Sequence, residues 1–287
     1  MDLIVDVDKL PVKGKTILGS TIKYVPGGKG ANLAVAASRL GGDVTFLGKV
    51  GEDNFGKQLT SFLSSEKLNV GGLEKSSLPS GMAVITVDTN GNNTIVVLLG
   101  ANREVSKAYI EKHEDLVKRA DVICTQLEIP LESAETLIGL AKKHNKTTIF
   151  NLAPVLSVST ETLRNVDYLV VNESELSTLV KSSKTIDEEN EIVKAVKSIK
   201  SQTVIVTLGE KGAIAVSKDK ILKVPGIKVK AVDTTAAGDC FVGAFATQID
   251  KGVELQEALD FANRASALSV QKWGASASLP SISELQS

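Results

Sequence analysis

Short runs of apolar residues recur along the chain and alternate with longer segments in which apolar side chains follow the period of a helix. The runs expected to form strands are residues 44–50, 121–126, 147–152, 168–171 and 203–208. Helical periodicity separates most of them, as at residues 131–144 and 188–200. Strands connected through helices pair in parallel and bury both faces of their sheet. The pattern therefore predicts an α/β fold in which a parallel-dominated sheet is flanked by helices on both faces.

Two segments do not follow this alternation. Residues 15–25 alternate polar and apolar side chains, and residues 81–99 form two strand-like runs joined at Thr89-Asn90-Gly91-Asn92. Asn-Gly between two such runs is a strong signal for a hairpin turn. We expect segments of about 12–26 and 81–100 to form a small β-sheet lid over a site. No repeat or linker divides the chain, so residues 1–287 are expected to form a single domain.

Composition narrows the classes of function. The chain has 33 basic and 34 acidic residues in mixed order, whereas a nucleic-acid surface needs a basic stripe or face. The two cysteines, Cys124 and Cys240, lie far apart and form neither a metal-binding spacing nor a disulfide framework. No apolar run is long enough to span a membrane, and acidic residues stand where a signal peptide has basic ones. We therefore expect a cytoplasmic protein without nucleic-acid or membrane partners.

The segment 233–239, Asp-Thr-Thr-Ala-Ala-Gly-Asp, precedes an apolar run that is typical of a buried helix. Its small residues Ala236, Ala237 and Gly238 allow the main chain to approach a ligand, and free amides at a helix start favour negative charge. These amides could hold a phosphoryl group in its transition state while Asp239 removes a proton. The alternative is that Asp239 only caps the helix.

A glycine-rich turn lies at Pro26-Gly27-Gly28-Lys29-Gly30-Ala31-Asn32, ahead of a helix rich in small residues. Its glycines permit a tight turn that brings backbone amides, Lys29 and Asn32 to a small polar ligand. The GxxxxGK[ST] spacing of a P-loop is absent, so Lys29 is not assigned the phosphate-binding role of that motif. A purely structural turn is the alternative.

Polar residues follow four of the predicted strands. They are Gln126-Leu127-Glu128, Asn151, Asn172-Glu173-Ser174-Glu175 and Thr207-Leu208-Gly209. Each cluster alone is more often a helix cap or a turn. Because parallel sheets bind ligands at the carboxyl ends of their strands, the clusters together predict a shared site. Glycines after the fourth strand permit close approach of the backbone to a nucleotide.

These motifs, in this order, resemble those of the ribokinase branch of the carbohydrate kinase family, which shares the ribokinase-like fold. Residues 27–32 are similar to its sugar-binding signature, 172–175 to its magnesium–phosphate signature and 233–239 to its catalytic signature. The resemblance covers nearly the whole chain. It implies an ATP-dependent kinase that phosphorylates the primary 5-hydroxyl of D-ribose, giving D-ribose 5-phosphate and ADP. The alternatives are a kinase of another sugar or of a nucleoside, and a catalytically impaired sugar- or nucleotide-binding protein.

The resemblance also implies roles for single residues. Asp239 would be the catalytic base, and the amides of Ala236, Ala237 and Gly238 would form the anion hole. The residues implied to bind the sugar are Asp2, Gly28, Lys29, Asn32, Glu128 and Asp239. Those implied to bind ATP are Asn172, Thr207, Gly209, Gly212, Gly238 and Asn263. Those implied to bind cations are Asn172 and Glu175 for Mg²⁺, largely through water, and Asp233, Thr235, Val270, Gly274 and Ser278 for K⁺.

Three features depart from the family pattern. Leu152 replaces the more usual proline after Asn151, a change that an extended backbone tolerates. Cys240 replaces the usual threonine or serine after Asp239, and we hypothesise that modification of its thiol inhibits the enzyme. Family members open with a further buried strand, so a shortened start is expected to weaken the fold and the site near Asp2.

A homodimer formed through the lid sheet is also expected, and its sign would be an apolar outer face on residues 81–99.

Overall fold

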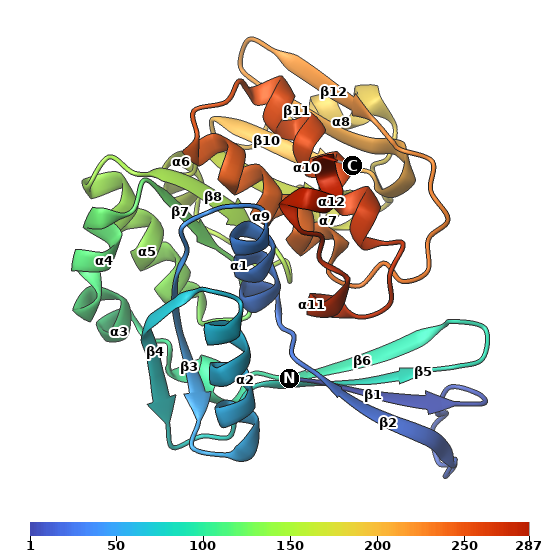
Figure 1. Ribbon diagram of the computed structural model, residues 1–287. Coiled ribbons are helices and arrows are strands. Elements are labelled where there is room, and N and C mark those ends of the chain that lie inside the picture. The colour runs from blue at the N-terminus through green and yellow to red at the C-terminus, as the bar shows by residue number, and fades with distance from the viewer. Residues whose placement is uncertain (287) are drawn as a thin grey trace.

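Six strands form the main sheet in the order β12-β11-β10-β9-β8-β7, in a computed structural model that describes residues 1–286 (Figure 1). Their bounds are β7 (Val122–Thr125), β8 (Thr147–Asn151), β9 (Tyr168–Asn172), β10 (Thr203–Thr207), β11 (Gly212–Ser217) and β12 (Ile221–Pro225). β7 to β10 pair in parallel, whereas β11 and β12 extend the sheet antiparallel. All five strands predicted from the apolar runs are present: four of them are β7 to β10, and the fifth is β3, which is described below.

Helices cover both faces of this sheet (Figure 1). Their bounds are α1 (Lys29–Arg39), α2 (Asn54–Ser65), α3 (Lys107–Lys112), α4 (Glu114–Arg119), α5 (Leu131–Lys143), α6 (Thr160–Arg164), α7 (Glu173–Leu179), α8 (Glu189–Val196), α9 (Ala237–Asp250), α10 (Leu255–Ser269), α11 (Ala275–Ser278) and α12 (Ile282–Gln286). Ile205 of β10 packs with Phe245 of α9 in one core cluster, and its neighbour Val204 packs with Ile192 of α8 in another. Alternate side chains of a strand point to opposite faces, so burial on both sides accounts for the continuous apolar runs. The predicted fold class is confirmed.

A second sheet of four strands projects from the body in Figure 1 and forms the lid. Its strands, in the order β2-β1-β5-β6, are β1 (Asp2–Val7), β2 (Gly19–Val25), β5 (Met82–Val87) and β6 (Asn93–Leu98). The predicted turn joins β5 and β6, with Gly91 at a φ of 82° that favours glycine. β1 was not expected in the lid, where it pairs antiparallel with β2 and parallel with β5.

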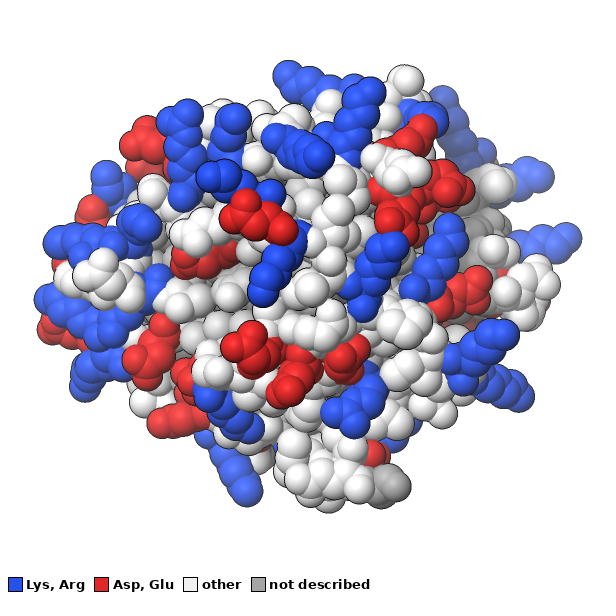
Figure 2. Space-filling view, turned by 90° about the horizontal axis from the view of Figure 1, so that it is seen from above, with Lys and Arg blue, Asp and Glu red and all other residues white. Residues whose placement is uncertain are grey.

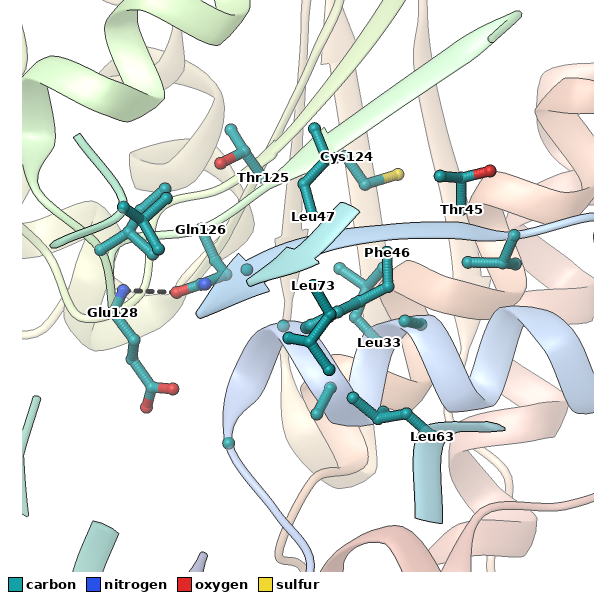
Figure 3. A pocket seen from close by; sticks show the side chains of 18 of the residues that line it. Leu33, Thr45, Phe46, Leu47, Leu63, Leu73, Cys124, Thr125, Gln126 and Glu128 are labelled. Carbon is teal, nitrogen blue, oxygen red and sulfur yellow. Dashed lines mark hydrogen bonds between the residues drawn. The ribbon is translucent and has the colours of Figure 1, made fainter. Parts of the chain in front are cut away.

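The remaining strands, β3 (Thr45–Gly51) and β4 (Asn69–Ser76), form a separate parallel pair. β7 is the edge strand of the main sheet, and β3 is an edge of the two-stranded sheet. Among the described residues no strand lies between them to pair with both, so the sheet is divided between β3 and β7. A cavity of about 560 Å³ occupies the division, and Leu33, Phe46 and Cys124 are among its apolar lining (Figure 3). Figure 3 shows side chains of both strands around this cavity, Thr45, Phe46 and Leu47 from β3 and Cys124 and Thr125 from β7.

Charged side chains of both signs are interspersed over the face of the molecule in Figure 2. This distribution agrees with the formal net charge of -1. Among the described residues, no helix has the length and apolar character that crossing a bilayer requires.

Candidate active site

The segment that leads into α9 places backbone amides toward open space. Ala236 precedes the helix in the left-handed region, with φ 61° and ψ 9°. The first bond of the helix runs from the amide of Cys240 to the carbonyl of Ala236, at 2.8 Å. The amides of Gly238 and Asp239 donate to no group among the described residues, whereas that of Ala237 donates to Thr234 O at 3.2 Å. Free first-turn amides carry the positive end of the helix dipole, so this helix start suits a phosphoryl group.

Asp239 lies in the first turn of α9 and is only 5% exposed. Its Oδ2 accepts a hydrogen bond of 3.0 Å from Nδ2 of Asn32, and its Oδ1 accepts none from the described residues. Burial raises the pKa of Asp239 to about 6, although Lys29 and Asn32 oppose the rise. Because the carboxylate bonds Asn32 and no amide of its own helix, helix capping does not explain it. A carboxylate with a raised pKa and a free oxygen suits a general base.

The glycine-rich turn holds two more carboxylates beside Asp239. Lys29 donates its amide to Oε2 of Glu128 at 2.9 Å. A Cβ on Gly27 would lie 2.0 Å from Oδ2 of Asp2, so this position requires glycine for the carboxylate to pack against it. Burial raises the pKa of Asp2 to about 6, the amino group of Met1 lowers it, and Glu128 adds to the rise. The turn therefore joins β1, α1 and the end of β7 into a polar cradle suited to hydroxyl groups.

A cavity of about 210 Å³ brings together the predicted base and anion hole with some of the residues predicted to bind sugar, ATP and Mg²⁺. It is lined by Lys29, Asn151, Ala153, Val170, Val171, Asn172, Glu175, Thr207, Thr234, Ala236, Ala237, Gly238 and Asp239. The larger cavity between β3 and β7 includes Asp2, Gly28 and Glu128 in its lining, most of which is apolar. Cavity volume therefore does not identify the active site in this protein, because the reactive groups line the smaller cavity.

Asn172 and Glu175 form a reciprocal cap at the start of α7. Oδ1 of Asn172 accepts from the amide of Glu175, and Oε2 of Glu175 accepts from the amide of Asn172, both at 2.8 Å. Burial raises the pKa of Glu175, against the effects of the Asn172 amide and Lys29. Among the described residues there is no cluster of three or more histidine, cysteine or acidic side chains that could hold a metal. Two oxygen-bearing side chains fit Mg²⁺, which retains water and binds substrate phosphates.

The residues predicted to bind ATP do not all converge. Thr207 lines the smaller cavity, and a Cβ on Gly209 would meet no heavy atom within 4 Å, so this turn is open to a ligand. Gly212 is packed instead, because a Cβ there would lie 2.0 Å from Val224 O. Asn263 donates from Nδ2 to Pro225 O at 3.0 Å and lies outside the cavity lining. The structure thus gives Gly212 and Asn263 packing and hydrogen-bonding roles within the fold.

Asp233 ties together the two loops predicted to hold a monovalent cation. Its Oδ1 accepts from the amide and hydroxyl of Thr235, at 2.9 and 2.7 Å. Its Oδ2 accepts from the amide of Gly274 at 2.9 Å. Val270 lies alongside, because its carbonyl accepts from the amide of Asp233 at 3.2 Å. Ser278 is buried in α11 and donates its hydroxyl to Ala275 O at 2.8 Å.

Sequence reasoning gave Thr234 and Ser276 no role and named Gln126 only within a strand-end cluster, whereas the structure places all three at or beside the site. Thr234 lines the smaller cavity, and Gln126 accepts a hydrogen bond through Oε1 from the amide of Glu128. Ser276 hydrogen-bonds Asn32, although 244 positions separate them. Position at a strand end drew attention to Gln126, but no local pattern indicates a contact as distant as that of Ser276.

Comparison with known proteins agrees with this geometry. A model of the pfkB family of carbohydrate kinases matches residues 1–282. The chain is 37% identical to a ribokinase of Bacillus subtilis, covering 100% of this chain and 95% of that protein. It is 35% identical to a deoxyribokinase of Salmonella typhi, covering 99% and 94%. A ribokinase of Arabidopsis thaliana, solved in complex with ribose and ATP, has a TM-score of 0.91 at 30% identity, covering 99% of this chain and 94% of that one. The chain therefore belongs to the pfkB family of carbohydrate kinases.

Proposed function

We propose that this protein transfers the γ-phosphoryl group of ATP to the primary 5-hydroxyl of D-ribose, giving D-ribose 5-phosphate and ADP. The observation that carries the proposal is Asp239, a buried carboxylate of raised pKa at the open start of α9, beside Lys29 and Asn32. The choice of ribose is supported by a ribokinase relative at 37% identity and by the similar Arabidopsis thaliana structure complexed with ribose and ATP.

In the proposed reaction, Oδ1 of Asp239 accepts the proton of the 5-hydroxyl as the sugar oxygen attacks the γ-phosphorus. The bond between that phosphorus and the bridging oxygen breaks, and ADP leaves with the electron pair. Amides at the start of α9, chiefly those of Gly238 and Asp239, offset the charge of the transferred group. Alignment and charge stabilisation provide most of the catalysis in such transfers.

The sugar is held, in this proposal, by the cradle of Asp2, Gly28, Lys29, Asn32 and Glu128. Burial of the Asp2 carboxylate favours hydrogen bonding to hydroxyl groups over exposure to water, and Glu128 beside it is half-buried. Thr207 and Gly209 provide the open turn for ATP. Gly212 and Asn263 support that turn, since Gly212 ends it and Asn263 anchors Pro225 beside it.

We assign Mg²⁺ to Asn172 and Glu175 and K⁺ to the loop pair joined by Asp233. When bound, Mg²⁺ would neutralise negative charge on the phosphates of ATP. The K⁺ ligands proposed are Asp233, Thr235, Val270, Gly274 and Ser278. Support comes from the carboxylate and carbonyl oxygens that the two loops present within one hydrogen-bonded unit.

The proposed assembly is a cytoplasmic homodimer that pairs through the lid sheet. Tyr24, Leu3, Val84 and Val96 are successive cross-strand partners and therefore share one lid face. Tyr24 and Val96 are 53% and 61% exposed, which is unusual for large apolar side chains on a sheet. A second copy could cover this row.

A substrate panel tests the proposed reaction. Purified protein, ATP, Mg²⁺ and K⁺ are incubated with ribose, 2-deoxyribose, fructose or adenosine, and ADP is measured against a control without acceptor. Ribose is expected to give the highest kcat/KM. A higher value for 2-deoxyribose would favour the activity of the Salmonella typhi relative, and ribose binding in calorimetry without ADP formation would favour a binding protein.

A further inference from the structure

Ser276 connects the carboxyl-terminal loops to the catalytic centre through a buried side chain. It lies in α11 and is 1% exposed. Its Oγ is 2.8 Å from Oδ1 of Asn32 and 2.9 Å from the carbonyl oxygen of Pro26. Nδ2 of the same Asn32 donates to Oδ2 of Asp239 at 3.0 Å. The three side chains therefore form a continuous hydrogen-bonded series that ends at the proposed base.

Ser276 contacts the oxygen of the Asn32 amide, and the nitrogen of the same amide contacts Asp239. A side-chain amide has an oxygen that only accepts and a nitrogen that only donates, so its orientation decides which group faces a carboxylate. Donation from Ser276 to Oδ1 of Asn32 leaves the amino group toward Asp239. The reversed amide would place its oxygen against Oδ2 of Asp239, so the carboxylate itself sets this orientation. The Ser276 hydroxyl, whose single proton faces both Oδ1 of Asn32 and the carbonyl oxygen of Pro26, holds the Asn32 side chain in place and so keeps its amino group within reach of Asp239.

The main chain around Ser276 is anchored independently of this series. Nη1 of Arg39 donates to the carbonyls of Ser276 and Leu279, at 2.9 and 2.8 Å. Arg39 is itself paired with Glu66 at 2.6 Å. On the other side of α11, the amide of Gly274 bonds Asp233 at 2.9 Å. Ser276 is therefore held at a fixed distance from Asn32, as a positioning contact requires.

We propose that Ser276 is a positioning residue for phosphoryl transfer: acting through Asn32, it orients the carboxylate of Asp239 toward the acceptor hydroxyl. The proposal rests on the proposed function, because it deepens the role of the same base. It also links the loop assigned to the monovalent cation to the base, since Gly274 and Ser276 belong to one short segment.

The test compares Ser276→Ala with Ser276→Thr, which keeps the hydroxyl. Loss of one positioning hydrogen bond is expected to lower kcat about tenfold in the alanine variant, with KM for ATP unchanged. The acid limb of the pH profile should move to higher pH, because Asn32 no longer holds its amino group toward Asp239. The charged groups Lys29, Asp2 and Glu128, which also act on Asp239, are the same in both variants. The threonine variant should recover both kcat and the profile.

Ser133→Ala is the matched control. Ser133 is 0% exposed and donates its hydroxyl to Val105 O, so this variant also loses a buried serine hydrogen bond, but in α5. Its kcat and pH profile should equal those of the unaltered protein. Wild-type kcat and an unmoved profile in Ser276→Ala would overturn the proposal. So would equal losses in the alanine and threonine variants without a change in the profile, since that result indicates packing alone.

A measurement without turnover separates this proposal from the substrate assignment. Titration of ¹³C-labelled aspartate carboxyls by NMR, with Asp239→Asn to identify the signal, should show a higher pKa for Asp239 in Ser276→Ala than in the unaltered protein. Equal values would contradict the positioning role whatever sugar the protein phosphorylates. Failure of ribose in the substrate panel would contradict the proposed function and leave this comparison intact.

Discussion

At the scale of single residues, burial separates the chemistry of two neighbours. Asp239 is 5% exposed but faces the smaller cavity, whereas Cys240 is 0% exposed and packs in the core with Phe245. The sequence places both beside the same helix start. Only the structure shows that Asp239 faces the smaller cavity and Cys240 the core.

Asp239→Asn is expected to stabilise the fold at neutral pH. Burial raises the pKa of Asp239 from 3.8 to about 6, so the folded state holds the proton more tightly than the unfolded chain. The free energy of unfolding therefore falls as the pH rises from about 3.8 to about 6, and the whole cost of burying the ionised carboxylate is present above that range. Asparagine removes a penalty on the order of 2–3 kcal/mol while its amide oxygen can still accept from Asn32. Urea unfolding measures this at pH 7 and pH 4; a gain of equal size at both would contradict the account.

Cys240 is expected to resist alkylation in the folded protein. Burial raises the pKa of its thiol to about 12, and the reactive thiolate is therefore scarce at neutral pH. The hypothesis that modification of Cys240 inhibits the enzyme stays a prediction, and burial restricts such modification in the native fold. Mass spectrometry after treatment with iodoacetamide should show Cys240 modified only when the protein is first unfolded. Rapid labelling of the native protein would contradict this expected resistance, and accompanying loss of activity would support inhibition through Cys240.

At the scale of elements, periodicity predicted the strands and the hairpin but not the partners of every strand. The apolar run of β10 and the Asn90-Gly91 turn could be predicted because neighbouring residues alone determine them. β1 has only six residues, too few for its pattern of polar and apolar side chains to predict that it pairs with β2 and β5. Site contacts such as Asn32 with Asp239 join residues 207 positions apart, so motifs could nominate both residues but not their hydrogen bond.

The lid face is expected to hold the dimer together. Val96→Glu places a charge on the lid face that carries the exposed Tyr24 and Val96, and burying this charge against a second copy is costly. The variant should be monomeric in light scattering under conditions where the unaltered protein is a dimer. Leu156→Glu, an exposed apolar position outside the lid, is the control and should leave the mass unchanged. A dimer that survives Val96→Glu would contradict assembly through this face.

At the scale of the whole molecule, packing is least complete where the sheet is divided. The cavity of about 560 Å³ separates β3 from β7, and partly buried side chains such as Phe46 and Cys124 face it. Phe245, by contrast, is 0% exposed within the core cluster on α9. The buried strand implied by family resemblance has no counterpart at this division in the described chain, where β1 belongs to the lid. Asp2, in β1, nevertheless packs against Gly27 beside the site.

The two cysteines offer a matched test of this difference in packing. Cys124→Met adds apolar volume toward the cavity, and burying the added group should stabilise the fold by about 1 kcal/mol, or roughly 2–4 °C in melting temperature. Cys240→Met adds the same volume to a filled core and should destabilise by about 1–3 kcal/mol. Calorimetric melting of both variants makes the comparison. Destabilisation by Cys124→Met as large as that by Cys240→Met would contradict an accessible cavity beside β7.

Turnover of ribose and ATP by Asp239→Asn tests the central claim, that this carboxylate deprotonates the acceptor, most directly. The account predicts a loss in kcat of about 10²- to 10⁴-fold, the usual contribution of a positioned general base. The affinity for ATP, measured by calorimetry, should change little, because no predicted ATP contact requires the charge of Asp239. Retention of kcat within a few-fold of the unaltered protein would contradict the account and remove Asp239 as the base.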